Sequence, residues 1–187
     1  MLTRSGLVRA IVFLDRDGVL NERKVGGYVD NAADLKPTDA IIPVLARCAS
    51  VDGLALVVVT NQGCISRELA SKGSVLALNR QLFRWLSARG VFIEACYVCP
   101  HHPLAVKAQN RKCECRKPKP GLLTMGLKEF GVSPDMALIL GDQQSDMMAG
   151  MQAGLSEDTC VMVDVADHGS VSKAILVVDE WRRGICA

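Results

Sequence analysis

The sequence predicts an α/β fold, with a mostly parallel sheet flanked by helices. Continuous apolar runs such as 11–14 and 54–59 are typical of strands buried on both faces of a parallel sheet. Segments with apolar residues at helical spacing separate these runs, so strands and helices alternate along the chain. Polar residues follow several of the runs directly, and open α/β sheets bind ligands at the carboxyl ends of their strands. The fold class therefore also predicts where a site would lie.

The same patterns assign the elements in order. We expect strands at 11–14, 54–59, 91–98, 136–140 and 160–163, and helices at 39–50, 74–89, 121–130 and 145–153. In the first of these helices, Pro43 is compatible only with the first turn, where backbone donors have no helical partner. In the tail we expect an edge strand at 174–178 and a terminal helix at 179–183.

Length and composition favour one globular domain that spans residues 1–187. The chain has 49% hydrophobic and 22% charged residues, an ordinary balance for a folded protein. A net charge of +2 is too small to indicate nucleic acid or a membrane surface as the main partner. No apolar run approaches the roughly 20 residues that span a bilayer, and residues 1–10 lack a signal-peptide core. We expect a soluble, cytoplasmic protein and, independently of composition, a monomer.

Two carboxylates at the end of the first predicted strand are the first candidate for chemistry. Asp15 and Asp17 follow the run 11–14 and precede Gly18. Unpaired charge is costly to bury, and a hard cation such as Mg²⁺ would stabilise these acids. Asp15 could then act as a nucleophile, because carboxylates form aspartyl phosphates. A strand that ends in a solvated turn explains the same residues equally well.

Polar residues also follow the second predicted strand, at 60–63, and repeat the arrangement after Asp15. The polar loop 21–36, with Gly26, Gly27 and Tyr28 at its middle, lies just beyond the first strand. It could contact substrate, or it could be an ordinary surface connection.

Four cysteine and histidine residues form a candidate zinc site. Cys99 and His101 make a C-x-H pair, and Cys113 and Cys115 follow as C-x-C after eleven residues. Three thiolates and one imidazole close a tetrahedron, which indicates a structural rather than a catalytic zinc. The pairs are tighter than the usual two-to-four spacing, and chance clustering is the alternative. Zinc would fasten the loop 100–114 and the basic segment after it.

His102 and Cys96 lie close to this cluster and have less specific interpretations. We expect His102 to be a loop or substrate-side residue and Cys96 to be a core residue. The chain has eight cysteines, and in a cytoplasmic protein thiols and metal ligation explain them better than disulfides do.

Together these pieces resemble the haloacid dehalogenase-like phosphatase superfamily over about residues 11–163. Its four motifs occur in order: D-R-D-G-V-L at 15–20, T-N-Q at 60–62, a basic residue at Lys117, and G-D-x-x-x-D at 141–146. More narrowly, G-Y-V at 27–29, C-P-H-H-P at 99–103 and C-x-C-R-K-P-x-P-G at 113–121 resemble the branch of heptose bisphosphate and histidinol-phosphate phosphatases. The resemblance implies a Rossmann-like haloacid dehalogenase fold with a zinc-binding loop and no large cap domain.

The resemblance also implies roles for individual residues. Asp15 would attack phosphorus, and Asp17 would act as general acid and then general base. Mg²⁺ would be bound by Asp15, Asp142 and the backbone carbonyl of Asp17. Thr60 and Lys117 would hold the nonbridging phosphoryl oxygens.

Substrate recognition is assigned in the same way. Arg116 would bind the substrate, plausibly through the phosphate that is not cleaved. Sugar or phosphate contacts would come from the remaining motif residues, Asn61, Gln62, Gly27 and Tyr28. Lys119 is expected to face solvent.

The implied substrate is D-glycero-D-manno-heptose 1,7-bisphosphate, cleaved at the 7-phosphate, with histidinol phosphate as the alternative. The chain departs from the pattern in three places. The loop after Asn21 is about two residues longer, Gly63 and Cys64 replace Ser-Gly, and Gln143 replaces a basic residue. These departures concern substrate contacts and leave the hydrolytic motifs intact.

Two readings from other functional classes are disfavoured. A receiver-like signalling domain would not need the second acid Asp17 or the segment Arg116 and Lys117. A zinc-dependent nucleic-acid module would use a basic surface and aromatic stacking, whereas the chain is nearly neutral and has 4% aromatic residues.

Overall fold

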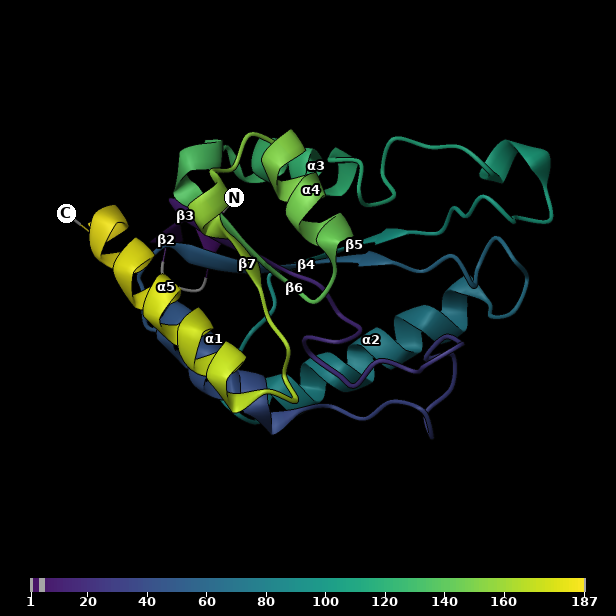
Figure 1. Cartoon of the computed structure of the whole chain (residues 1–187), viewed down its shortest axis with the longest axis horizontal. Helices are drawn as coiled ribbons and strands as arrows, with labels where there is room; N and C mark the ends of the chain where they lie inside the picture. The colour runs from purple at the N-terminus through teal and green to yellow at the C-terminus, as the bar shows by residue number, and fades with distance from the viewer. Residues whose placement is uncertain (1, 4–5, 187) are drawn as a thin grey trace.

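A five-stranded parallel sheet forms the centre of the molecule (Figure 1). The computed structural model describes residues 2–3 and 6–186. The strands are β3 (Ala10–Leu14), β4 (Leu54–Asn61), β5 (Ala95–Cys99), β6 (Ala137–Gly141) and β7 (Cys160–Met162). Their order in the sheet is β5-β4-β3-β6-β7, with every neighbouring pair parallel. The predicted fold class is confirmed, and β3 occupies the middle of the sheet.

Helices cover both faces of the sheet (Figure 1). One layer contains α1 (Ile42–Ala49), α2 (Lys72–Ser87) and α5 (His168–Cys186), and the other contains α3 (Gly121–Phe130) and α4 (Gln144–Gln152). Four short 3₁₀ helices lie in the connections: η1 (Asp39–Ile41), η2 (Ala108–Asn110), η3 (Pro134–Met136) and η4 (Glu157–Thr159). Pro43 lies in the first turn of α1, as predicted. A small antiparallel pair, β1 (Leu2–Thr3) and β2 (Gly6–Leu7), precedes the sheet.

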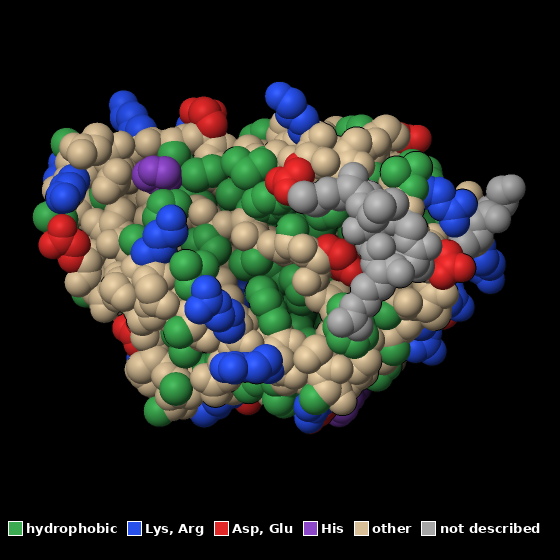
Figure 2. Space-filling model, turned by 180° about the vertical axis from the view of Figure 1, so that it is seen from behind, with side chains coloured by type: hydrophobic (Ala, Val, Ile, Leu, Met, Phe, Trp, Pro, Cys, Tyr) green, Lys and Arg blue, Asp and Glu red, His purple; other side chains and the backbone are tan. Residues whose placement is uncertain are grey.

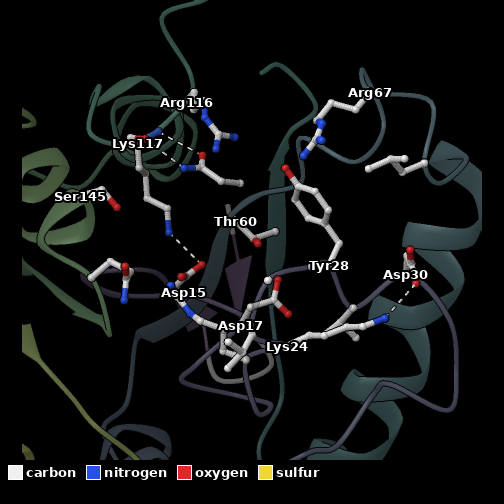
Figure 3. Close-up of a pocket in the computed structure, with 18 of the residues that line it drawn as sticks. Asp15, Asp17, Lys24, Tyr28, Asp30, Thr60, Arg67, Arg116, Lys117 and Ser145 are labelled. Carbon is white, nitrogen blue, oxygen red and sulfur yellow. Dashed lines mark hydrogen bonds and ion pairs between the residues drawn. The ribbon is translucent and has the colours of Figure 1, made fainter. Parts of the chain in front are cut away.

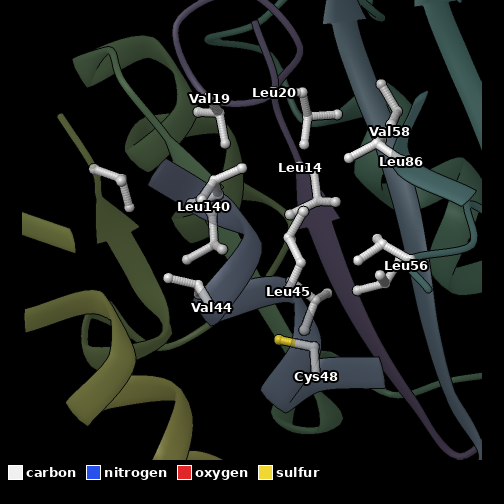
Figure 4. Close-up of a cluster of buried hydrophobic side chains, with 14 of the residues drawn as sticks. Leu14, Val19, Leu20, Val44, Leu45, Cys48, Leu56, Val58, Leu86 and Leu140 are labelled. Atoms are coloured by element: carbon white, nitrogen blue, oxygen red, sulfur yellow. The ribbon is translucent and has the colours of Figure 1, made fainter. Parts of the chain in front are cut away.

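The alternation of side chains along β3 divides the core into two clusters. Val12 and Leu14 face α1, α2 and α5, whereas Ile11 and Phe13 face α3 and α4. Figure 4 shows the first cluster around Leu14, which is completely buried. Because both faces of β3 are buried, each of its apolar side chains contributes about 1.5–3 kcal/mol of burial free energy. This packing holds the end of β3, where the acid pair begins, in a fixed position.

The predicted edge strand at 174–178 is wrong, because these residues belong to the long helix α5. Val171, Ala174 and Val178 are buried against the cluster around α1, and their spacing of three and four residues is helical. An ion pair of 3.2 Å between Arg47 and Asp179 adds a contact between the two helices. The β-branched residues in this segment suggest a strand, but tertiary packing overrides such propensities.

The predicted strand 91–98 begins only at Ala95. Val91 instead completes the end of α2, where its amide donates to the Leu86 carbonyl at 3.1 Å. Gly90, just before it, has φ +80°, a left-handed conformation that ends helices and favours glycine. The ladder with β4 starts afterwards, where Ala95 pairs with Val57.

Loops rather than a separate domain surround the carboxyl end of the sheet. The segment 15–38 is fully described and forms turns and isolated bridges, without a helix or strand that could build a large cap. Among the described helices, none combines the length and apolar character needed to cross a membrane. The seven cysteines whose side chains are described are all free thiols. On the face opposite to Figure 1, basic side chains are spread among acidic, apolar and neutral ones (Figure 2).

Candidate active site

The candidate active site is a cleft of about 910 Å³ at the carboxyl ends of β3 and β4 (Figure 3). These ends are adjacent because β3 pairs with β4 on one side and with β6 on the other. The sequence-predicted residues that line the cleft are Asp15, Asp17, Gly27, Tyr28, Thr60, Asn61, Arg116 and Lys117. Residues separated by about a hundred positions are therefore brought together, as the strand-end argument predicts.

One carboxylate oxygen of Asp15 is held by protein groups, and the other is open. Its Oδ1 accepts the Arg16 amide at 2.8 Å and pairs with Lys117 Nζ at 2.8 Å. No described residue donates to Oδ2, so this oxygen remains available for a metal or for phosphorus. Burial raises the pKa of Asp15 to about 6, although Lys117 acts in the opposite direction. Asp15 therefore lines the cleft with one carboxylate oxygen held and the other without a donor among the described residues.

Lys117 is buried and has three partners. Its Nζ donates to the Val59 carbonyl at 2.8 Å and pairs with Asp15 at 2.8 Å and Asp146 at 2.6 Å. Burial lowers the pKa of Lys117, but the two carboxylates outweigh burial and raise it overall. The lysine is therefore a fixed positive charge beside Asp15.

Asn61 holds the backbone of Lys117. Its side-chain nitrogen donates to the Lys117 carbonyl at 3.0 Å, and its oxygen accepts the Lys117 amide at 3.1 Å. This reciprocal pair ties the end of β4 to the segment after the cysteines. The sequence predicts substrate contact for Asn61, and the structure adds a positioning role while leaving it on the wall of the cleft.

Asp17 is fixed by a buried arginine that the sequence analysis did not assign. The fully buried Arg16 donates from Nε and Nη2 to the Asp17 carboxylate at 2.8–3.0 Å. Further donors are Asn21 Nδ2 at 2.9 Å and Gln62 Nε2 at 2.8 Å. Arg16 is anchored in turn by Asn79, at 3.0 Å. The sequence signal for this role of Arg16 is its position between Asp15 and Asp17.

Gln62 lies beneath the cleft instead of lining it. The side chain is completely buried, and its amide nitrogen donates to Asp17 and, at 2.9 Å, to Thr60 Oγ1. The predicted substrate contact of Gln62 therefore has no counterpart in the cleft lining. Because Thr60 Oγ1 accepts this bond, its own proton stays free to be donated to a ligand.

The Asp142 carboxylate packs directly against Gly18, next to the acid pair Asp15 and Asp17. Gly18 has φ +99°, and a Cβ at this position would lie 2.0 Å from Asp142 Oδ2. Only glycine permits both the backbone conformation and this close approach. Arg23, from the loop after β3, pairs with Asp142 at 2.8 Å. Burial raises the pKa of Asp142, and Arg23 offsets part of this increase.

The acidic residues fit a divalent cation. Oxygens of Asp15, Asp142 and Asp146 lie within 4.8 Å of one another. Asp15 and Asp142 are predicted ligands, whereas Asp146 is not. Among the described residues, no donor reaches the Asp17 carbonyl, which is the third predicted ligand. Mg²⁺ prefers a few carboxylates, water and substrate phosphate to an all-protein cage, and this open set has that character.

The four predicted zinc ligands converge at the end of β5. Ligand atoms of Cys99, His101, Cys113 and Cys115 lie within 4.8 Å of one another. Cys99 Sγ is 3.7 Å from Cys113 Sγ and 3.1 Å from Cys115 Sγ, and His101 Nδ1 is 3.3 Å from Cys115 Sγ. Thiolates bound to one tetrahedral zinc at 2.3 Å would lie about 3.8 Å apart, so the donor set fits zinc. Burial raises the pKa of the Cys99 and Cys115 thiols, and zinc would offset that cost of ionisation.

Hydrogen bonds connect the loop of the cysteine cluster to segments that line the cleft. Arg116 follows Cys115 in sequence and donates to the His101 carbonyl at 3.1 Å. On the opposite side, Ser66 N donates to the Pro100 carbonyl at 3.2 Å, and Val106 N donates to the Ser66 carbonyl at 2.9 Å. The segments that carry Arg67 and Arg116 are therefore both attached to the loop 100–114, which connects the predicted zinc ligands.

Comparison with known proteins agrees with this geometry. Residues 114–170 match the family model described as HAD-hydrolase-like. A D-glycero-beta-D-manno-heptose-1,7-bisphosphate 7-phosphatase of Pasteurella multocida is 36% identical over 154 residues, which covers 82% of this chain and 82% of that relative. This protein belongs to the haloacid dehalogenase-like hydrolase family.

Solved structures of the haloacid dehalogenase-like family have the same architecture. A HAD-like phosphatase of Mesorhizobium loti has a TM-score of 0.81 and 26% identity, covering 94% of this chain and 88% of that chain. A D,D-heptose 1.7-bisphosphate phosphatase of B. bronchiseptica, complexed with magnesium and phosphate, has a TM-score of 0.70 and 27% identity. That match covers 79% of this chain and 78% of that chain.

One departure from the family pattern has a local explanation. A Cβ at position 63 would lie 2.8 Å from His102 Cδ2, so Gly63 allows the imidazole to pack against the turn after β4. His102 is half-buried here and is not among the clustered metal ligands. Lys119 pairs with Glu114 at 2.7 Å and is exposed, as predicted.

The outer part of the cleft contains residues that the sequence analysis missed. Arg23, Lys24 and Arg67 line it together with Gly27 and Tyr28. Lys24 pairs with Asp34 at 2.6 Å, and the Arg67 guanidinium lies 5.8 Å from the centre of the Tyr28 ring. These cations belong to loops without a motif of their own, so no sequence signal marked them.

Proposed function

We propose that this protein is a Mg²⁺-dependent phosphomonoesterase that hydrolyses the 7-phosphate of D-glycero-D-manno-heptose 1,7-bisphosphate. The observation that carries the proposal is the oriented Asp15 carboxylate, with Oδ1 held by Lys117 and Oδ2 without a donor among the described residues. The names of the relatives support the substrate, and they do not favour histidinol phosphate. The zinc ligands are proposed to stabilise the loop that carries Arg116.

In the first half-reaction, Asp15 Oδ2 attacks phosphorus and the bond to the sugar oxygen breaks. Asp17 gives a proton to that leaving oxygen. Thr60 and Lys117 hold the nonbridging oxygens, where fixed donors and cations stabilise the charge of the transition state. The products are an aspartyl phosphate on Asp15 and a heptose that retains its 1-phosphate.

In the second half-reaction, Asp17 takes a proton from water, which attacks phosphorus and releases inorganic phosphate. This step regenerates Asp15 and returns the proton to Asp17, so both residues are ready for another turnover. Asp15, Asp142 and the Asp17 carbonyl would hold Mg²⁺, which supplies positive charge to the phosphoryl oxygens when bound.

The proposed product fits a biosynthetic setting. A heptose 1-phosphate is the form that a nucleotidyltransferase activates, so the enzyme would serve nucleotide-heptose synthesis for lipopolysaccharide core or surface glycans. We further propose that it works in the cytoplasm as a monomer. Size-exclusion chromatography with light scattering tests the monomer, because a dimer would double the measured mass.

Phosphate release with Mg²⁺ from both anomers of the heptose bisphosphate, compared with histidinol phosphate, tests the function. We expect kcat/KM to be at least about 100-fold higher for one bisphosphate anomer than for histidinol phosphate, because histidinol phosphate has no second phosphate to bind the cations of the outer cleft. Faster hydrolysis of histidinol phosphate would overturn the substrate assignment. Hydrolysis of neither compound would overturn the proposed function.

A further inference from the structure

A buried polar network adjoins Asp17. The side chain of Asp17 lines the cleft and is 22% exposed, whereas Arg16 is completely buried. The Arg16 guanidinium donates to the Asp17 carboxylate from Nη2 at 2.8 and 2.9 Å and from Nε at 3.0 Å. Among the described residues, Asp17 is the acid that pairs with Arg16. The orientation of Asp17 therefore depends on where this guanidinium group lies.

Asn79 holds the third nitrogen of the same guanidinium group. Its Oδ1 accepts from Arg16 Nη1 at 3.0 Å, and Nη1 has no other acceptor within residues 2–3 and 6–186. Asn79 lies on α2, is 3% exposed and does not line the cleft. A polar side chain is costly to bury unless it is hydrogen-bonded. The other buried residues of this helix are all apolar: Val75, Leu78, Leu82 and Leu86. Asn79 is therefore better explained by its bond to Arg16 than by packing.

Two further contacts restrict this arrangement. Asn79 Nδ2 donates to the sulfur of Cys96, on β5, at 3.4 Å, so the amide keeps its oxygen toward Arg16. Arg16 Nη2 also donates to the Val29 carbonyl at 3.3 Å, in the loop that contains Tyr28. All three guanidinium nitrogens thus have acceptors. Because the group is planar and buried, it cannot rotate without leaving a donor unpaired.

We propose that Asn79 is a positioning residue for the general acid. It holds Arg16, and Arg16 holds Asp17 where the carboxyl group can deliver a proton to the leaving oxygen. This inference rests on the proposed function, in which Asp17 is the acid, and adds a residue of α2 that belongs to no motif. Proton transfer requires the acid to lie within hydrogen-bonding distance of the oxygen it protonates. A change at Asn79 should therefore slow the reaction although every group in the cleft is retained.

The proposal predicts an effect that depends on the leaving group. Asn79→Leu removes the acceptor and keeps a side chain of similar size. We expect kcat/KM for the heptose 1,7-bisphosphate to fall by roughly 10- to 100-fold, because general acid catalysis contributes about 100- to 10,000-fold and only its geometry is impaired. For p-nitrophenyl phosphate, whose leaving group needs no proton, the fall should be less than about 3-fold. The comparison uses kcat/KM because this quantity reports the steps through departure of the leaving group.

A rescue variant and a control on the same helix accompany Asn79→Leu. Asn79→Asp keeps an oxygen acceptor for Arg16 and loses the donor to Cys96, and it should recover most of the loss on the bisphosphate. Leu78→Ala is the matched control, because Leu78 is 5% exposed and packs in the apolar cluster. It should lower the unfolding temperature, and any change in kcat/KM should be the same for both compounds.

The outcomes separate positioning from a purely structural role. An equal fall for both compounds in Asn79→Leu, or no fall for either, would overturn the role of Asn79. So would a fall on the bisphosphate that Asn79→Asp does not recover. If thermal unfolding shows that Asn79→Leu is not folded, Asn79→Ala gives the same comparison, because it removes the acceptor without crowding the core. A wild-type enzyme that releases no phosphate from the heptose bisphosphate would instead overturn the proposed function.

Discussion

The inner and outer halves of the cleft differ in how their charged groups are satisfied. In the inner half, Asp15, Asp17 and Lys117 are held by two or more protein partners each. In the outer half, Arg67 and Arg116 are half-buried and have no acidic partner among the described residues. The inner groups lie on or against buried strand ends, and the outer groups lie on loops.

This difference suggests that the inner half performs the reaction and the outer half recognises the substrate. Groups that stabilise a transition state act best when fixed in advance, because no reorganisation is then needed during the reaction. Unpaired cations, in contrast, gain their partner only when an anionic ligand arrives. We therefore expect substitutions in the inner half to lower kcat and substitutions in the outer half to raise KM.

The largest effect is expected for Asp15→Asn, which should reduce kcat on every phosphomonoester by at least about 1000-fold. The amide is nearly isosteric but is not a nucleophile, and Lys117 keeps its ion pair with Asp146. Steady-state phosphate release measures the loss, and circular dichroism checks the fold. A kcat within 10-fold of wild type would mean that the substitution raises the activation free energy by less than roughly 1.4 kcal/mol. That result would contradict the assignment of the reaction to the inner half.

A metal-ligand variant should affect stability and recognition together. Cys115→Ser removes one of the four proposed zinc ligands, next to Arg116, and the segments that carry Arg67 and Arg116 are both attached to this loop. We expect an unfolding temperature lower by roughly 10 °C, which corresponds to about 3 kcal/mol. KM for the bisphosphate should also rise. Cys160→Ser, in a thiol outside the cluster, is the control for both measurements.

A smaller effect is expected for Gln62→Met, which keeps the volume of a buried side chain but removes the donor to Asp17 and Thr60. The loss of oriented hydrogen bonds should lower kcat by about 10-fold while KM changes little. Because the proposed acid role of Asp17 matters less for a good leaving group, hydrolysis of p-nitrophenyl phosphate should be less affected than hydrolysis of the sugar phosphate. A rise in KM with unchanged kcat would place Gln62 with the outer half instead.

The smallest effect is expected for Arg23→Gln. Arg23 pairs with Asp142, which belongs to the acidic cluster that fits Mg²⁺. Removing the competing guanidinium should increase Mg²⁺ affinity by about 2- to 5-fold, because an exposed ion pair contributes up to about 1 kcal/mol. Isothermal titration calorimetry without substrate measures this directly. Weaker Mg²⁺ binding would show that Arg23 orients Asp142 instead of competing for it.

The inner half could be predicted from sequence because its residues follow strands. A buried strand is visible as an apolar run, so Asp15 and Thr60 were located by the runs that precede them. Parallel strands bring their carboxyl ends together, and that rule predicted the neighbourhood of these two residues. The cluster of three cysteines and one histidine could equally be predicted, because its C-x-H and C-x-C spacing is typical of metal ligands.

The outer half was harder to predict because its positions depend on loop conformation. Arg67 is placed by a turn with a left-handed residue and by hydrogen bonds to a segment more than thirty residues away. Gln62 is buried with its amide nitrogen hydrogen-bonded to Asp17, and Arg16 holds Asp17 in turn. The terminal helix predicted at 179–183 is confirmed as part of α5, but the stretch 174–178 was predicted as a strand, because packing against α1 outweighs its β-branched composition.

The most direct test of the account is to locate the phosphoryl group during turnover. Enzyme mixed with heptose bisphosphate labelled at the 7-phosphate should be quenched on the millisecond scale, digested and mapped by mass spectrometry. The account predicts transient label on the peptide that contains Asp15, and no labelled peptide in Asp15→Asn. Label on another residue, or wild-type phosphate release by Asp15→Asn, would contradict the proposed mechanism.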